Sequence, residues 1–482
     1  MDAQLLINSE FLSARDGRTF ERRNPISGEV ASRAPAAGPD DIKAAVEAAQ
    51  AALPEWSGLG PNARRTALLS ASQELLNLAD DFVDAMKVEI GATEGWARFN
   101  VKLASDMLVE AAALTTQVSG QIIPSDKPGC LAMAMRKPAG VVLGIAPWNA
   151  PIILGVRAVA TPLACGNTVI LKASEVCPVT HMLIGKALAA AGLPKGAINV
   201  ITNAPEDAGD VVGELIDHKN VRRVNFTGSS HVGRIIAERA ARTFTPVLLE
   251  LGGKAPLLVL EDADLDEAVK AIAFGAYMNQ GQICMSTERV IVEESVADAL
   301  VAKLTAKAAT LVAGDPREGK TPLGALVDQK SVDHVLGLIE DARSKGADVT
   351  VGGTAEGVQM SATVVDKVDN SMRIYTEESF GPVLAVIRVK DAEEAVTIAN
   401  DSEYGLSAAV FSKDIVKALK IAERIDSGIC HINGATVHDE AQMPFGGTKS
   451  SGYGRFGGLA GINEFTDLRW ITMETQPGHF PI

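Results

Sequence analysis

Short apolar runs rich in β-branched residues alternate along this chain with longer amphipathic stretches. The runs have the length of buried strands, and the stretches repeat apolar residues at steps of three and four, as helices do. Strands that alternate with helices form parallel sheets covered by helices, so the pattern predicts an α/β fold. A chain of 482 residues has room for about three domains of roughly 100 to 200 residues each.

The alternation is clearest between residues 140 and 292. A further helix should follow Ser229, and another should begin at Asp262 or Asp264 and end near Asn279. The remaining predicted elements are strands at 140–145, 168–171, 221–226, 247–251, 256–260 and 289–292 and helices at 152–164 and 181–191.

Composition excludes several classes of protein. A net charge of -15, with no run of Lys or Arg, argues against nucleic acid as a partner. No uncharged apolar stretch is long enough to span a membrane, and the first residues have no signal-peptide pattern, so we expect a cytoplasmic protein without a membrane partner. The five cysteines form no CxxC pair and the seven histidines no cluster of ligand spacing, so neither disulfides nor a metal site is expected.

Cys284 follows a glycine turn between a predicted helix and a predicted strand, in Asn279-Gln280-Gly281-Gln282-Ile283-Cys284-Met285-Ser286. Loops at the ends of such elements display nucleophiles, but a lone cysteine is as often a small buried side chain. The residues around Cys284 leave both interpretations open.

Glu250 lies in an apolar strand that is followed by two glycines and Lys254. A carboxylate among leucines is costly unless it is neutral, paired or functional. Burial would raise its pKa toward that of a general base, and an ion pair with Lys254 or an arginine is the alternative.

Two strand ends could hold a nucleotide. Gly228 and Ser229 form a glycine turn before a helix, whose first N–H groups can bind a pyrophosphate. Lys172 and Glu175 follow another strand, where they could bind ribose hydroxyls or simply form a solvated ion pair.

Seven short motifs follow one another along the chain: Pro147-Trp148-Asn149, Lys172-Ala173-Ser174-Glu175, Phe226-Thr227-Gly228-Ser229, Leu249-Glu250-Leu251-Gly252-Gly253-Lys254, Gln280-Gly281-Gln282-Ile283-Cys284, Glu378-Ser379-Phe380-Gly381-Pro382 and Pro444-Phe445-Gly446-Gly447. In this order they resemble the motifs of the aldehyde dehydrogenase superfamily, and the resemblance runs from about Asn8 to about Thr472. Within the superfamily the chain is similar to the bacterial salicylaldehyde and hydroxybenzaldehyde branch.

The resemblance implies a division of the chain into three parts. They are a Rossmann-like NAD-binding domain at 1–119 and 139–250, an α/β catalytic domain at 251–467, and a β oligomerisation extension at 120–138 and 468–482. It also implies a homodimer or a dimer of dimers.

The resemblance assigns the chemistry as well. Cys284 would be the nucleophile, Glu250 the base that activates water, and Asn149 an oxyanion donor. NAD is favoured over NADP, because a carboxylate at Glu175 accepts a 2′-hydroxyl and repels a 2′-phosphate. The other implied cofactor contacts are Pro147, Trp148, Lys172, Gly228, Ser229, Leu251, Gly252, Glu378 and Phe380.

Two positions depart from the pattern of many members: Phe456 stands where a Glu is frequent, and Ala158 where a Lys is frequent. Both family residues are associated with proton relay from Glu250. The proton is therefore expected to leave through water or backbone groups.

The implied substrate tunnel favours an aromatic aldehyde. Three aromatic residues and a methionine at tunnel positions suggest a slot for a flat ring, although ordinary helix packing also explains Trp96 and Phe99. Arg157 would need an anionic or hydrogen-bonding partner, which a phenolic hydroxyl could supply. A carboxylate-bearing aliphatic aldehyde such as succinic semialdehyde is one alternative, and a catalytically silent dinucleotide-binding protein is another. The tunnel positions are Trp96, Phe99, Arg157, Ile283, Met285 and the segment Val437 to Phe445.

Overall fold

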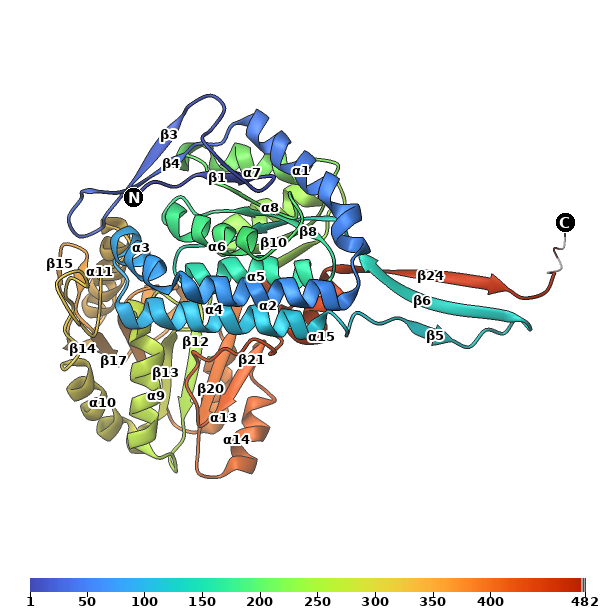
Figure 1. The fold of residues 1–482 in the computed structure, drawn as a ribbon. Coiled ribbons are helices and arrows are strands. Elements are labelled where there is room, and N and C mark those ends of the chain that lie inside the picture. Colours follow the sequence, from blue (N-terminus) through green and yellow to red (C-terminus); the bar gives the residue numbers. More distant parts are fainter. Residues whose placement is uncertain (478–479, 481) are drawn as a thin grey trace.

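The computed structural model describes residues 1–477, 480 and 482, which form two α/β bodies and a projecting β arm (Figure 1). Strand β1 lies near the top of the view and β20 near the bottom, and the arm extends to the right. Among the helices of these residues, none is long and apolar enough to cross a membrane.

The first body is built on an eight-stranded sheet of order β2-β1-β9-β8-β7-β10-β11-β23. Its five central strands, which are β9, β8, β7, β10 and β11, run parallel. Strands β1, β2 and β23 pair antiparallel at the two edges. The carboxyl ends of the parallel strands therefore share one edge, where ligands bind in open α/β sheets. The strands are β1 Leu5–Ile7, β2 Glu10–Leu12, β7 Val141–Ile145, β8 Thr168–Lys172, β9 Ile198–Ile201, β10 Val221–Thr227, β11 Val247–Glu250 and β23 Gly452–Tyr453.

Helices cover both faces of this sheet. One face packs under α1, α7 and α8, and the other under α5 and α6, with α2, α3 and α4 forming a further layer. Each face contributes its own buried apolar cluster, as expected for a parallel sheet. The helices are α1 Pro39–Gly58, α2 Pro61–Asn77, α3 Ala79–Ile90, α4 Glu94–Leu114, α5 Pro151–Ala164, α6 Pro178–Ala190, α7 Ala208–Asp217 and α8 Ser230–Ala241, and a small separate sheet pairs β3 Thr19–Arg23 with β4 Val30–Pro35.

The second body is built on a seven-stranded sheet of order β14-β17-β18-β13-β12-β20-β21, in which only β14 runs antiparallel. Helices α9 and α10 cover one face, and α11, α13 and α14 cover the other. The sheet strands are β12 Ala255–Val259, β13 Thr287–Glu293, β14 Asp348–Val351, β17 Thr363–Asp366, β18 Val383–Val389, β20 Ser407–Phe411 and β21 Ile429–Ile432. The helices are α9 Leu265–Tyr277, α10 Glu294–Ala308, α11 Gln329–Ser344, α12 Arg373–Thr376, α13 Ala392–Asn400, α14 Ile415–Ala422 and α15 Gly458–Glu464, and two short ladders pair β15 Ala355–Glu356 with β16 Gln359–Met360 and β19 Tyr404–Gly405 with β22 Thr448–Lys449.

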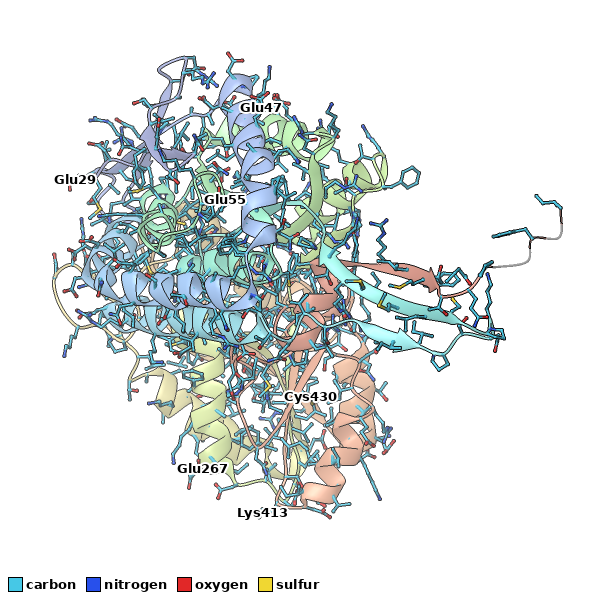
Figure 2. All side chains as sticks on the ribbon, turned by 45° about the vertical axis from the view of Figure 1, so that its right-hand side comes forward. Glu29, Glu47, Glu55, Glu267, Lys413 and Cys430 are labelled. Atoms are coloured by element: carbon cyan, nitrogen blue, oxygen red, sulfur yellow. The ribbon has the colours of Figure 1, made fainter. Side chains whose placement is uncertain are left out.

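The arm is a three-stranded sheet made from distant parts of the chain. Strand β24 (Thr466–Glu474) pairs antiparallel with β6 (Cys130–Pro138), and β5 (Gln121–Ile123) pairs with β6 on its other side. Figure 2 shows the arm standing clear of both bodies, and Trp470 and Ile122 are each 77% exposed on it. Residues 478–479 and 481 of the predicted extension lie outside the described residues, and the division into three domains stays a prediction.

The predicted elements between residues 140 and 292 are confirmed, with ends that shift by three residues or fewer. Asp264, and not Asp262, caps α9 by accepting the N–H groups of Asp266 and Glu267. The helix ends at Tyr277, two residues earlier than predicted, because the chain turns there into the short 3₁₀ helix η2 (Met278–Gly281).

Candidate active site

The turn that carries Cys284 is held in an uncommon backbone conformation. Asn279 and Gln280 have positive φ values of 49° and 56°, which non-glycine residues rarely adopt. The Gln280 side chain fixes the turn from both ends of its amide, since Nε2 donates to the Ala325 carbonyl at 3.0 Å and Oε1 accepts the Gly324 N–H at 2.9 Å. Such local strain persists where surrounding contacts enforce it, and it is common at functional sites.

Cys284 and Glu250 meet at the end of β11. The Cys284 thiol donates to Glu250 Oε1 at a distance of 3.4 Å, and the Glu250 residue is 1% exposed. Burial raises the pKa of Glu250 to about 7, while the charge of Arg157 opposes that rise. Burial and the adjacent Glu250 carboxylate also raise the pKa of Cys284 well above its usual value. The thiol therefore needs a base, and Glu250 is placed to accept its proton.

Strand β23 fixes the position of that base. It pairs with β11 so that Glu250 faces Gly452, and the Leu251 N–H donates to the Ser451 carbonyl at 3.1 Å. The second oxygen, Glu250 Oε2, has no hydrogen-bond partner among the described residues. It remains available to accept a hydrogen bond from a water molecule.

Asn149 lies beside the same turn, just before α5. Its backbone carbonyl accepts hydrogen bonds from the Trp96 indole at 3.0 Å and from the Asn279 amide at 2.9 Å. Its side-chain Nδ2 donates to the Gln282 carbonyl at 3.0 Å. The Asn149 amide thus binds the residue two positions before Cys284, and Asn149 and Cys284 line the same cavity.

A cavity of about 240 Å³ opens above Cys284 and Glu250 at the carboxyl edge of the first sheet. Gly252 lets the Glu378 side chain lie close to the backbone, because a Cβ at this position would be 2.7 Å from Glu378 Oε2. Ser229 caps α8 and presents the N-terminus of that helix to the cavity. These features fit a dinucleotide. Eight of the ten predicted cofactor contacts line the cavity: Pro147, Trp148, Gly228, Ser229, Leu251, Gly252, Glu378 and Phe380.

Glu378 is held in place by a polar network that the sequence did not suggest. Its Oε1 accepts the Gly253 N–H at 2.8 Å, and burial together with the charge of Glu288 raises its pKa to about 8. Lys254 pairs with Glu288 at 2.5 Å, and Glu288 also accepts the Ser379 N–H. The ion pair between Lys254 and Glu250, which the sequence analysis considered as an alternative, is therefore not formed.

Lys172 and Glu175 pair with each other at the end of β8. The Lys172 side chain is 5% exposed and that of Glu175 20%, so the pair is largely buried and not the solvated one considered as an alternative. Asn203 Nδ2 also donates to Glu175 Oε1 at 2.8 Å. Neither Lys172 nor Glu175 lines the 240 Å³ cavity, and their role at an adenosine ribose stays a prediction.

Most of the predicted substrate residues are buried in one large apolar core. Trp96, Ile283, Met285 and Phe445 belong to the core on one side of the first sheet, and Cys284 packs against this core. Phe99 stacks on Trp96 with ring centroids 5.6 Å apart but is 44% exposed, so it lies at the outer side of this core. Ile283 and Met285 flank the nucleophile in the sequence, and Trp96 is joined to the site by its hydrogen bond to the Asn149 carbonyl.

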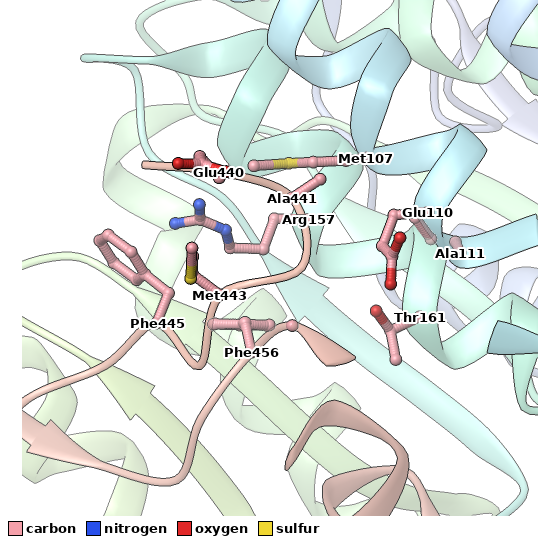
Figure 3. A pocket seen from close by; sticks show the side chains of 12 residues that line it. Met107, Glu110, Ala111, Arg157, Thr161, Glu440, Ala441, Met443, Phe445 and Phe456 are labelled. Atoms are coloured by element: carbon pink, nitrogen blue, oxygen red, sulfur yellow. The ribbon is translucent and has the colours of Figure 1, made fainter. Parts of the chain in front are cut away.

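Arg157 already has an anionic partner within the protein. Its guanidinium forms a buried ion pair with Asp439, whose side chain is 9% exposed, and lies 4.1 Å above the Phe445 ring centre. Figure 3 shows Arg157 above Phe445 and Phe456, which line a small cavity of about 20 Å³ with it. The predicted tunnel segment Val437 to Phe445 includes Asp439, but its pairing with Arg157 was missed because an acidic residue between His438 and Glu440 has the sequence character of a solvated loop.

The two departures from the family pattern are both buried here. Ala158 and Phe456 supply no charge near Glu250, and the Phe456 ring centre lies 5.8 Å from the Arg157 guanidinium. The charges that act on the pKa of Glu250 are instead Arg157, which lowers it, and Asp439, which raises it.

Residues 11–471 match the Aldehyde dehydrogenase family, and the chain belongs to it. It is thus an oxidoreductase of a family that acts on aldehydes with NAD or NADP. Vanillin dehydrogenase of Pseudomonas fluorescens is 60% identical over 482 residues, and salicylaldehyde dehydrogenase of Pseudomonas putida is 47% identical over 482 residues, each with 100% of both chains covered. The crystal structure of a salicylaldehyde dehydrogenase from Pseudomonas putida G7 complexed with salicylaldehyde superposes with a TM-score of 0.98, at 46% identity and with 100% of both chains covered.

Proposed function

We propose that this enzyme oxidises an aromatic aldehyde with a ring hydroxyl, such as vanillin or salicylaldehyde, to its carboxylic acid with NAD. The observation that carries the proposal is the 3.4 Å contact between Cys284 and Glu250, beside a buried cluster that contains Trp96 and Phe445. The printed activities of the relatives at 60% and 47% identity support the substrate class.

The geometry supports a sequence of steps for the residues of this chain. Glu250 accepts the thiol proton, and the Cys284 sulfur attacks the aldehyde carbon. The oxyanion that forms is stabilised by the Asn149 amide and the Cys284 N–H. NAD, when bound, supplies the acceptor for the hydride that leaves this carbon. Glu250 gives up the thiol proton to solvent through water or backbone groups, and then removes a proton from the water that attacks the thioester. The leaving Cys284 thiolate takes up this second proton, so the acid and the free thiol are released.

The ion pair of Arg157 favours the aromatic substrate over succinic semialdehyde. A substrate carboxylate would have to displace Asp439 from a buried ion pair, and breaking such a pair costs several kcal/mol. A flat ring needs no such exchange and can pack against the apolar cluster. The intact contact of Cys284 with Glu250 argues against a silent binding protein.

The arm supports the proposal of a homo-oligomer, either a dimer or a tetramer. It exposes large apolar side chains such as Trp470 and Leu468, which monomeric proteins usually cover. The antiparallel strands β5 and β24 form its two edges and could extend a partner's sheet. Location in the cytoplasm remains part of this proposal.

The test is NADH production by the purified enzyme with a panel of aldehydes. The panel comprises benzaldehyde, the three hydroxybenzaldehydes, vanillin, succinic semialdehyde and hexanal, compared by kcat/KM. We expect vanillin or a hydroxybenzaldehyde to lead. A lead by succinic semialdehyde would overturn the aromatic proposal, and no turnover with any aldehyde would favour the silent protein.

A further inference from the structure

The ion pair of Arg157 with Asp439 satisfies only one oxygen of the carboxylate. Asp439 Oδ2 accepts from Arg157 Nη2, while Oδ1 is buried and has no hydrogen-bond partner among the described residues. A buried carboxylate oxygen without a donor is costly, and such atoms in native proteins usually have a partner or a role. Oδ1 is therefore an acceptor without an internal donor.

This acceptor belongs to the segment that closes the apolar cluster around the nucleophile. Val437 and Ala441, two residues to either side of Asp439, pack against the cluster that includes Ile283, Met285 and Cys284. Arg157, which holds Asp439, lies on α5 and stacks on Phe445 of the same cluster. Asp439 belongs to the segment that the family resemblance places along the substrate tunnel, and its charge acts on the pKa of Glu250.

Whether a hydrogen-bond donor or an acceptor is left unpaired depends on the ion pair of Arg157. Arg157 is engaged by Asp439, so the unpaired group presented here is an acceptor and not a donor. An acceptor selects a ligand that donates a hydrogen bond. A phenolic hydroxyl does so, whereas a methoxy group cannot.

We propose that Asp439 Oδ1 accepts the hydrogen bond of the substrate's ring hydroxyl, with Arg157 as the positioning residue that holds the carboxylate. The inference rests on the proposed function, since it requires an aromatic aldehyde in the slot. It assigns selectivity for phenolic aldehydes to a carboxylate, and it reverses the expectation that the Arg157 guanidinium would contact the hydroxyl.

Selectivity is tested by the ratio of kcat/KM for 4-hydroxybenzaldehyde to that for 4-methoxybenzaldehyde. In Asp439→Asn, the amide oxygen should turn toward Arg157 and the NH₂ group toward the slot, so we expect this ratio to fall about 10- to 100-fold. Asp298→Asn is the matched control, because that carboxylate lies on α10 with 91% of its side chain exposed and pairs with Arg388; its ratio should stay at the wild-type value. An unchanged ratio in Asp439→Asn would overturn the proposal.

A second measurement separates a direct contact from a structural effect. The phenolate of 4-hydroxybenzaldehyde absorbs at longer wavelength than the phenol, so a pH titration of ligand bound to Cys284→Ala reports the phenol pKa without turnover. The charged groups at the site are Glu250, Arg157 and Asp439, with Glu378 acting on Cys284, His438 acting on Asp439, and Glu110 and Glu440 lining the cavity beside Arg157. A carboxylate acceptor should keep the bound phenol protonated to a higher pH than in free ligand, and Asp439→Asn should abolish this rise. Ionisation at a lower pH than in free ligand would mean that Arg157 contacts the oxygen, and would refute the inference.

Two further results keep the outcomes distinct. The double variant Arg157→Met, Asp439→Leu removes both charges and leaves no buried ion unpaired, so its ratio should fall as in Asp439→Asn; a retained ratio would count against the proposal. If benzaldehyde is oxidised normally but neither the ratio nor the phenol pKa depends on Asp439, only this inference fails. If no aromatic aldehyde binds or reacts, the proposed function fails with it.

Discussion

Replacement of Glu250 by Gln should separate the two proton transfers in which this carboxylate takes part. A general base works only when ionised, so with a pKa of about 7 its active fraction rises from about one tenth at pH 6 to about nine tenths at pH 8. The steady-state rate limited by thioester hydrolysis should therefore rise about ninefold over this interval. In Glu250→Gln that rise should vanish, and the rate at pH 8 should fall by about 10² to 10⁴.

The assay is stopped-flow NADH formation with a hydroxybenzaldehyde at pH 6, 7 and 8. Because the Cys284 thiol donates to Glu250, the initial burst should also slow in Glu250→Gln, which would not occur if Glu250 acted on water alone. Glu238→Gln, at an exposed position of α8, is the isosteric control and should keep both phases. A wild-type burst followed by a steady rate that does not change between pH 6 and pH 8 would refute the assignment of the pKa to the catalytic base.

Other changes test the neighbouring assignments. Asn149→Ala should lower kcat by about 10² to 10³ with a smaller change in KM, because an oxyanion donor acts mainly in the transition state; equal losses in binding would contradict this role. Glu175→Gln should lower the ratio of kcat/KM for NAD to that for NADP, and an unchanged ratio would exclude a contact with the 2′-hydroxyl. Trp470→Asp should shift the oligomer toward smaller species in light scattering, since each buried copy of such a side chain contributes about 1.5–3 kcal/mol; an unchanged mass would leave the arm outside the interface.

Periodicity and strand-end motifs were sufficient to predict the strands and helices around the site. Lys172, Ser229 and Glu250 each end or follow a parallel strand, and parallel strands with right-handed crossovers bring those ends to one edge. Eight of the positions that the family resemblance assigned to the cofactor line one cavity at this edge. The local signals were strong here because strand, turn and helix follow within few residues.

The partners of buried charges could not be predicted in this way. Arg157 meets Asp439 across 282 residues of sequence, and Lys254 meets Glu288 from a neighbouring strand. Nothing local in the sequence distinguishes these carboxylates from solvated ones, because their burial depends on how distant loops pack. The positive φ of Asn279 and Gln280 is equally a product of tertiary contacts with the loop at Gly324 and Ala325.

The pairing of Glu250 with Gly452 has a consequence for synthesis of the chain on the ribosome. Strand β11 receives its outer neighbour only after about 200 further residues have been made, which takes about 10 to 40 s at usual rates of translation. During that time β11 is an open edge of the first sheet, a position that invites pairing with other nascent chains. A chain that stops before β23 thus lacks the strand that positions Glu250 and pairs with this edge of the sheet. Incomplete products should therefore be recognised by chaperones and proteases before they can bind substrate.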